Sequence, residues 1–219
     1  MSRINISVSL ILLFIATLLF LFVNKITTPR VLSAEELLMN GFYSLNVPKK
    51  FSEFSMLSSN DKVIDKSFLL NKWTLVYFGY TQCPSECPVT LSASRQLYAL
   101  LRNRGYDLLN HQLLLVTIDP ERDTPDSVNK YAQAFDDNFH GARPTRPALL
   151  SLASQLDVMV TEPKSNHQGH HTDAHLENHM NNLILINPDG KYVGFFRPSF
   201  EPERMSIVYQ SVTLSLIHI

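Results

Sequence analysis

Residues 73–90 read WTLVYFGYTQCPSECPVT, and the rest of the expected architecture is arranged around this segment. Its residues 75–78 form an apolar run of aromatic and β-branched side chains, which is typical of a buried strand. Residues 79–82 predict a turn, and a helix pattern follows over 88–104, with Gly105 as the expected C-terminal cap. We therefore expect a buried strand that leads through a short loop into a helix.

The segments around this unit alternate between strand and helix patterns. Strands are predicted over 113–118, 158–161, 183–186 and 192–196, shorter extended pieces over 51–57 and 63–70, and helices over 34–39, 125–138, 147–156 and 201–216. Thr124 and Pro125 form a helix start, because threonine suits the N-cap and proline the first helical position. Residues 187–190, NPDG, indicate a hairpin. This order predicts an α/β fold, a thioredoxin-like sandwich whose central mixed sheet is flanked by helices.

Composition limits the classes of function. The 219 residues carry a net charge of −1, so no basic surface indicates nucleic-acid binding. Cys83 and Cys87 are the only cysteines, too few for a disulfide framework. Two unrelated buried thiols are the simple alternative. Two cysteines four residues apart, with none elsewhere, instead indicate a shared task.

The position of Cys83 and Cys87 favours thiolate chemistry. A helix N-terminus lowers the pKa of a thiol, because its free N–H groups and partial positive charge stabilise the thiolate. Helix residues four apart have Cβ atoms about 5–6 Å apart, whereas a disulfide needs about 3.5–4.5 Å. A metal ion between the sulfurs tolerates the wider gap, so the spacing modestly favours metal binding over dithiol exchange. Cu(I) and zinc both suit thiolates, and Cu(I) accepts fewer ligands, so one imidazole would complete its site.

Histidines are concentrated in one segment. Five of the eight lie there, namely His167, His170, His171, His175 and His179. A solvated polar loop is the alternative, although this composition also indicates metal binding. His179 lies nearest the strand predicted over 183–186, so the scaffold can hold it toward the cysteine loop. The other four are candidates for a secondary metal site. His111 and His140 are expected at the surface.

The N-terminal segment predicts a membrane anchor. Residues 8–23 form an almost unbroken apolar run that, extended back to Ile4, is just long enough for a hydrocarbon core of about 30 Å. A cleaved signal peptide is the alternative, with only a weak cleavage site at 32–34. We expect a transmembrane helix as a single anchor over 1–24, a connector over 25–50 and a folded domain over 51–219. This organisation predicts a bacterial inner-membrane protein whose soluble domain lies in the periplasm.

Three motifs together resemble the SCO/SenC family: YFGYTQCPSECP at 77–88, IDPERDTP at 118–125, and His179 nine residues before the proline of NPDG. The family consists of membrane-anchored, thioredoxin-like copper proteins needed to assemble cytochrome c oxidase, and the resemblance covers about 51–216. It implies that Cys83, Cys87 and His179 bind a copper ion, as Cu(I) and alternatively as Cu(II). Asp119 matches an acidic residue found near the family's site, and a loop-forming role is the alternative.

The resemblance implies a copper metallochaperone for the binuclear copper A centre of cytochrome c oxidase subunit II. Other copper chaperones or thiol reductases would be further partners. The alternative is a thiol–disulfide oxidoreductase, an enzyme in which Cys83 and Cys87 act as a redox pair that keeps the oxidase subunit's cysteines reduced. A peroxiredoxin-like peroxidase fits poorly, because both cysteines share one loop. A metal buffer built on the histidine-rich segment would survive substitution of the cysteines.

The chain departs from the family pattern next to the expected histidine ligand. Asn178 stands where the family commonly has aspartate, so one negative charge is missing beside the expected metal. Asp173 and Glu177 are near enough in sequence to replace it.

Overall fold

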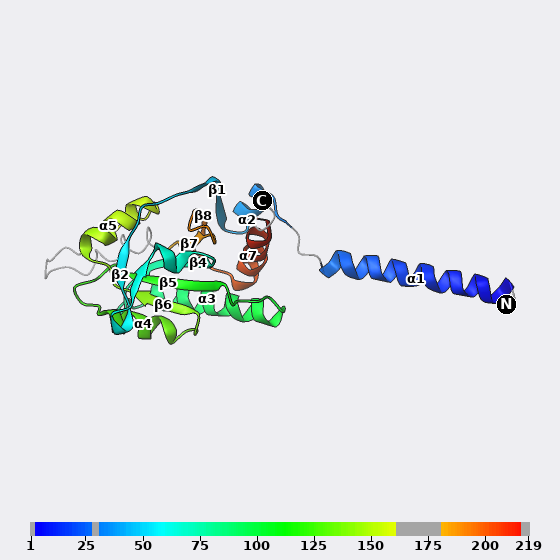
Figure 1. Cartoon of the computed structure of the whole chain (residues 1–219), viewed down its shortest axis with the longest axis horizontal. Coiled ribbons are helices and arrows are strands. Elements are labelled where there is room, and N and C mark those ends of the chain that lie inside the picture. Colours follow the sequence, from blue (N-terminus) through cyan, green and yellow to red (C-terminus); the bar gives the residue numbers. More distant parts are fainter. Residues whose placement is uncertain (1–2, 28–30, 161–180, 216–219) are drawn as a thin grey trace. The chain divides into compact units, whose positions relative to one another are not determined.

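The structure is a computed structural model that describes residues 3–27, 31–160 and 181–215. The chain divides into two compact units, one of residues 1–31 with 210–219 and one of residues 32–209. The second unit contains a six-stranded sheet (Figure 1). The strands lie in the order β1 (Phe42–Lys49), β8 (Tyr192–Phe196), β7 (Leu183–Ile186), β4 (Trp73–Gly79), β5 (His111–Thr117) and β6 (Phe139–Ala142).

The directions of the strands confirm the predicted mixed sheet. β4, β5 and β6 run parallel, in the register Trp73↔His111 and Leu113↔Phe139. β7 is antiparallel to β4 and to β8, and β8 is antiparallel to β1. All seven residues of β4 are buried, as expected for a central strand with both faces covered.

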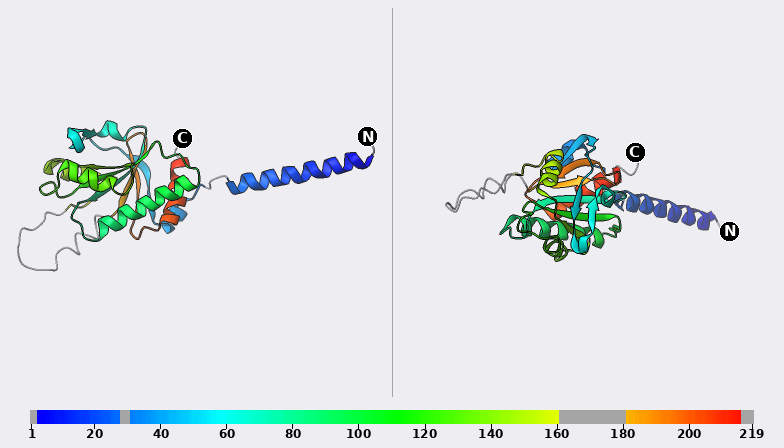
Figure 2. Two further views of the ribbon diagram at one scale, coloured as in Figure 1. Left: turned by 90° about the horizontal axis from the view of Figure 1, so that it is seen from below. Right: turned by 60° about the vertical axis from the view of Figure 1, so that its left-hand side comes forward.

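Helices cover both faces of this sheet (Figure 2). On one face lie α3 (Glu86–Asn103), where Tyr98 contacts Phe139, and α4 (Pro125–Gln133), whose Val128 backbone leaves no room for a Cβ on Gly141. On the other face α5 (Arg146–Gln155) shares a core cluster with Val76 and Phe78. That cluster also includes residues from the hairpin of β2 (Ser55–Leu57) and β3 (Val63–Asp65) and from η2 (Lys66–Leu69). The remaining elements of residues 32–209 are α2 (Ala34–Met39), η1 (Ser59–Asp61) and the first part of α7 (Pro202–Ser215).

Several local signals are confirmed at their expected positions. Gly105, with φ +75°, follows α3 and accommodates the left-handed turn that ends the helix. The Thr124 hydroxyl accepts a hydrogen bond from the Ser127 N–H, and the Ser127 hydroxyl accepts one from the Thr124 N–H. Asn187 and Gly190 close the turn between β7 and β8, with Gly190 N–H donating to the Asn187 carbonyl at 2.9 Å.

Other sequence predictions need correction. Residues 42–49 of the expected connector form β1 and pair with β8, so the folded domain begins before residue 51. Residues 158–160 form no strand, and residue 161 lies outside the described residues. Val158 instead joins the core cluster, which explains its apolar character. β6 had not been expected, because its four residues include a histidine and a glycine.

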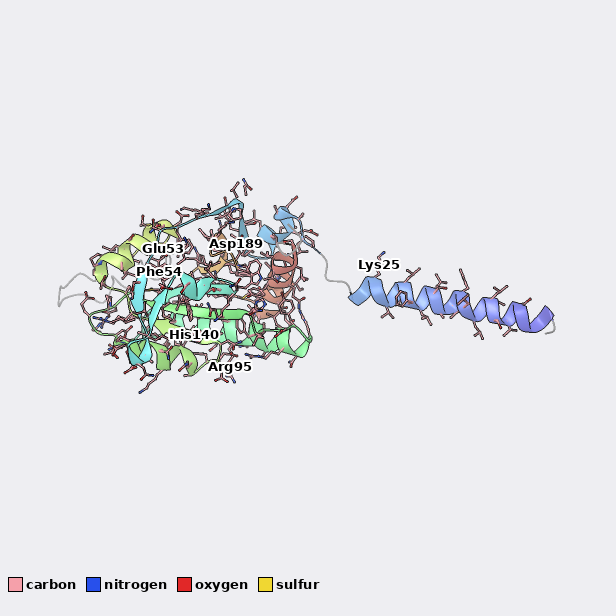
Figure 3. All side chains as sticks on the ribbon, viewed as in Figure 1. Lys25, Glu53, Phe54, Arg95, His140 and Asp189 are labelled. Carbon is pink, nitrogen blue, oxygen red and sulfur yellow. The ribbon has the colours of Figure 1, made fainter. Side chains whose placement is uncertain are left out.

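The two histidines expected at the surface are also placed differently. His111 on β5 is buried and its Nδ1 lies 2.7 Å from the Tyr209 hydroxyl of α7. His140 is half-buried on β6 (Figure 3), with its ring against Phe68. Burial lowers the pKa of each to about 4, so both are neutral at neutral pH. The expectation failed because both histidines lie on paired strands, where packing buries His111 and half-buries His140.

The first unit contains α1 (Arg3–Thr27), which confirms a helix where the apolar run predicted one. Its large apolar side chains between Val8 and Val23 are exposed. Within the part of the chain that the structure describes, no helix combines the length and apolar character needed to cross a membrane.

Candidate metal centre

The two cysteines lie where β4 passes into α3. Cys83 is in the connecting loop, and Cys87 is in the first turn of the helix. Both are buried, with 8% and 2% of their surfaces exposed. The Cys87 N–H donates to the Cys83 sulfur at 3.3 Å. Both residues are free thiols, so the structure brings together the two sulfurs that the sequence selected.

The two thiols differ in acidity. A hydrogen bond from the Cys87 thiol lowers the pKa of Cys83 to about 6, with further help from the backbone N–H groups of residues 85–87. Cys87 donates that hydrogen bond and is deeply buried, and both effects raise its pKa far above the ordinary value. Near neutral pH the pair therefore consists of one thiolate and one thiol.

Gly79 provides the room for the second sulfur. A Cβ at this position would lie 2.9 Å from the Cys87 Sγ, 2.9 Å from Tyr77 Cε1 and 3.2 Å from Leu115 Cδ1. These distances are too short for an unstrained side chain. The glycine is therefore needed because Cys87 packs directly against the last residue of β4.

Asp123 fixes the loop before Cys83. Its carboxylate, 3% exposed, accepts hydrogen bonds from the Thr81 N–H at 3.1 Å, from the Thr81 hydroxyl and from the Thr117 hydroxyl at 2.5 Å. Thr81 is two residues from Cys83, so Asp123 joins the cysteine loop to the end of β5. The sequence motif IDPERDTP contains Asp123, but sequence reasoning singled out Asp119 instead.

Asp119 has the loop-forming role that was one of its two expected roles. Its carboxylate pairs with Arg122, and its backbone carbonyl accepts from the N–H groups of Arg122 and Asp123. Arg122 in turn lies over the Tyr80 ring at 6.0 Å. These contacts shape the turn that presents Asp123 to Thr81.

A second group of side chains contacts Cys87. The Tyr77 hydroxyl lies 3.6 Å from the Cys87 sulfur and 3.3 Å from Asn181 Oδ1. The Asn181 Nδ2 donates to Glu86 Oε2 at 3.0 Å. Sequence reasoning missed Tyr77 and Asn181, because neither position carries a local signal of its role. The Tyr131 hydroxyl is buried without a hydrogen-bond partner among the described residues, and burial together with the two cysteines raises its pKa to about 12.

The histidines expected to complete a metal site are not described. His179 and the secondary candidates His167, His170, His171 and His175 lie outside the described residues, as do Asp173, Glu177 and Asn178. Among the residues that are described, no three Cys, His, Asp or Glu side chains come together as a ligand set. Cys83 and Cys87 nevertheless fit a soft ion, because one sulfur is ionised near neutral pH and the other lies beside it.

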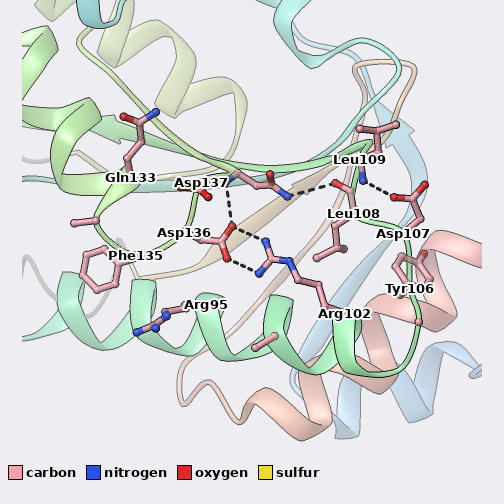
Figure 4. A pocket seen from close by; sticks show the side chains of 14 residues that line it. Arg95, Arg102, Tyr106, Asp107, Leu108, Leu109, Gln133, Phe135, Asp136 and Asp137 are labelled. Carbon is pink, nitrogen blue, oxygen red and sulfur yellow. Dashed lines mark hydrogen bonds and ion pairs between the residues drawn. The ribbon is translucent and has the colours of Figure 1, made fainter.

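A pocket elsewhere in the domain does not contain the cysteines. It lies between the second half of α3 and the segment after α4, and its lining includes Arg95, Arg102 and Tyr106 (Figure 4). Arg102 is already bound to Asp136 through two hydrogen bonds of 2.7 and 2.8 Å. The positive charge of the Arg102 guanidinium is therefore already paired with a carboxylate.

Comparisons with known proteins match this fold and these motifs. A protein of Stutzerimonas stutzeri whose name refers to copper binding is 31% identical over 145 residues, covering 66% of this chain and 68% of that protein. The solution structure of apo Sco1 from Thermus thermophilus has a TM-score of 0.65 and 26% identity, covering 77% of this chain and 94% of that one.

A third match is a fold likeness. BsSco, described as a member of the Sco family of cytochrome c oxidase assembly proteins with a disulfide switch, has a TM-score of 0.59 and 18% identity, covering 78% of this chain and 97% of that one. The family model of SCO1/SenC matches residues 45–213, which include β4, both cysteines and the Asp123 loop. The chain therefore belongs to the SCO1/SenC family.

Proposed function

We propose that this protein is a copper metallochaperone for the binuclear copper A centre of cytochrome c oxidase subunit II. The observation that carries the proposal is the buried pair of Cys83 and Cys87, whose sulfurs lie together at the start of α3. Copper is the cargo, bound by the two sulfurs and the His179 imidazole. The copper-binding name of the Stutzerimonas stutzeri relative and the oxidase-assembly description of BsSco support this proposal.

The pair loads a metal through a proton release. Cys83 is ionised near neutral pH, whereas Cys87 carries a proton that must leave before its sulfur can bind as a thiolate. One positive charge, that of Cu(I), then faces two thiolates. Cu(I) is the proposed cargo ion because thiolates are soft ligands, and the same three residues would hold Cu(II) as the alternative state.

Other segments of the chain also have proposed roles. Histidines 167, 170, 171 and 175 are proposed as a weaker secondary metal site. Residues 1–24 are proposed as a single anchor in a bacterial inner membrane, with the copper-binding domain in the periplasm. The apolar run 8–23 within α1 supports the anchor. Proposed partners besides subunit II are other copper chaperones or thiol reductases.

Competition for Cu(I) tests the proposal. We expect the reduced full-length chain to hold one equivalent against a chromogenic chelator, and Cys83→Ser or Cys87→Ser to lose it. His179→Ala should weaken binding severely, and His167→Ala is the matched control within the same histidine-rich segment. Tight Cu(I) binding by either cysteine variant would contradict the proposal.

A thiol–disulfide oxidoreductase is the second candidate. The unequal acidity of the two thiols favours it, because the Cys83 thiolate can attack a partner disulfide and release one partner thiolate. Cys87 then gives its proton to that thiolate and attacks the Cys83 sulfur as a thiolate, which releases the second partner thiolate and leaves a Cys83–Cys87 disulfide. The disulfide switch of BsSco also supports it. Under this function His179→Ala should leave the rate of reduction of a model disulfide unchanged. A large loss of that rate would count against the oxidoreductase.

A further inference from the structure

The amide of Asn181 connects the two sides of the cysteine site. Its side chain, 7% exposed, accepts from the Tyr77 hydroxyl at 3.3 Å and donates to Glu86 Oε2 at 3.0 Å. These two contacts assign the orientation of the amide, because the flipped form would direct its oxygen at the carboxylate. A buried amide with both ends paired is held in one position.

Glu86 carries a carboxylate, a group that can bind metal ions, directly beside one of the two cysteines. It is the first residue of α3 and precedes Cys87 directly. An ionised carboxylate is favourable at a helix N-terminus. Two thiolates with a carboxylate are also donors that Zn²⁺ accepts, whereas thiolates by themselves favour Cu(I). The direction in which Glu86 points therefore affects which metal the site prefers.

The structure keeps this carboxylate out of the ligand set. Within the described residues, Glu86 forms no metal-ligand group with Cys83 and Cys87. Its Oε2 is bound to Asn181, which lies on the chain leading into β7. Tyr77 holds the other end of the amide and also contacts the Cys87 sulfur. The carboxylate is thus fixed through a bridge of side chains from three separate segments.

We propose that Asn181 is a specificity-determining residue for the cysteine site. By binding the Glu86 carboxylate, it prevents an oxygen ligand from joining the two sulfurs and so favours Cu(I) over Zn²⁺. The inference rests on the proposed copper-binding function and deepens it. Asn181 does not touch the metal in this role, since it acts through Glu86.

The test compares the affinities of the full-length chain for Cu(I) and for Zn²⁺, each measured with a chromogenic chelator. Asn181→Leu removes both polar ends of the side chain while filling a similar volume, and Asn181→Ala is a second variant. We expect the ratio of Zn²⁺ to Cu(I) affinity to rise about tenfold or more in both, because outer-shell substitutions typically change metal affinity by about 10–100-fold. Asn182→Ala is the matched control, because within the described residues the side chain of Asn182 makes no hydrogen bond to the cysteine loop.

Adding Glu86→Gln to Asn181→Leu makes the test specific. The double variant should return to the wild-type ratio of Zn²⁺ to Cu(I) affinity, since the amide that Glu86→Gln introduces is a poor metal ligand. A general loss of folding would persist in the double variant and cannot imitate this return. An unchanged ratio in the single variants, or a change that persists in the double variant, would overturn the inference.

The proposed function and the inference fail in different ways. A wild-type chain without Cu(I) affinity would overturn the copper function. The inference would then be judged from Zn²⁺ alone, where Asn181→Leu must gain about tenfold affinity and Glu86→Gln must remove that gain. Absence of this gain would overturn the inference independently.

Discussion

At the scale of single residues, Cys83 and Cys87 become chemically unequal although the sequence presents them as a pair. Cys83 receives hydrogen bonds from the Cys87 thiol and from backbone N–H groups, while Cys87 is enclosed by Gly79 and Tyr77. Donors to the Cys83 sulfur stabilise its anion, whereas Cys87 donates its own proton to Cys83 and is deeply buried, and both of these effects favour its neutral thiol. The position relative to the helix start thus assigns different roles to two identical side chains.

Thiolate absorbance measured against pH should reveal this difference. We expect one thiol of the reduced, metal-free chain to ionise with a midpoint near pH 6, because the pKa of Cys83 is lowered to about 6. The thiolate is present above that pH and is lost as the pH falls through it. Cys83→Ser should abolish the step. Cys87→Ala should move it upward, because the largest cause of the lowered pKa is then removed. A wild-type midpoint near the ordinary value of 9.0 would contradict this assignment.

At the scale of elements, two strand–loop–helix units are joined by one buried carboxylate. β4 leads through the cysteine loop into α3, and β5 leads through the Asp119–Asp123 loop into α4. The parallel pairing of β4 with β5 places both loops at the same sheet edge. Asp123 then binds Thr81 across the gap between them. The cysteine loop is consequently held from outside its own segment.

Asp123→Ala should destabilise the protein and loosen the cysteine loop. We expect a loss of about 3 kcal/mol in the free energy of unfolding, because each hydrogen bond to a charged group contributes about 1.5–3 kcal/mol and buried donors would remain unpaired. Urea unfolding measures this loss. The rate of Cys83 alkylation should rise in the same variant.

The matched control for Asp123→Ala is Asp126→Asn, which alters an exposed acid in the first turn of α4. It should cost only about 0.3–1 kcal/mol through the helix dipole. Equal losses in both variants would show that the Asp123 carboxylate does not hold the loop.

At the scale of the whole molecule, a folded unit of residues 32–209 is preceded in sequence by α1 with its exposed apolar side chains. The folded unit has its own sheet with both faces covered, and its core cluster lies within residues 51–192. Within the described residues, the contacts given above for Cys83 and Cys87 come from residues of this unit. The cysteine chemistry is thus contained in the folded unit, and the proposed anchoring role falls to α1.

Fractionation of cells expressing the full-length chain should find it with the membranes, resistant to alkaline carbonate washing. The apolar run 8–23 would be buried in lipid, where each buried CH₂ contributes about 0.8 kcal/mol. A chain starting at Leu32 should appear in the soluble fraction with its thiol titration unchanged. Recovery of the full-length chain in the soluble fraction would contradict the anchor.

Much of the fold follows from local patterns in the sequence. The buried run of β4, the Thr124–Pro125 helix start and the NPDG hairpin are local signals, and each predicted its element correctly. The choice of Cys83 and Cys87 was also possible from spacing and position. β6 and the burial of His111 were not predictable in this way, because they depend on pairing with β5 and packing against α7.

The sequence thus established the type of fold, the family motifs and the two sulfurs, since these depend on residue types at short spacing. The partners of the sulfurs were established only by the tertiary structure. Tyr77 and Asn181 are 104 residues apart, and Asp123 and Thr81 are 42 residues apart. Such contacts depend on how strands pair and helices pack, and no local pattern encodes them. For that reason the cysteines could be found from the sequence, while the residues that position them and orient Glu86 could not.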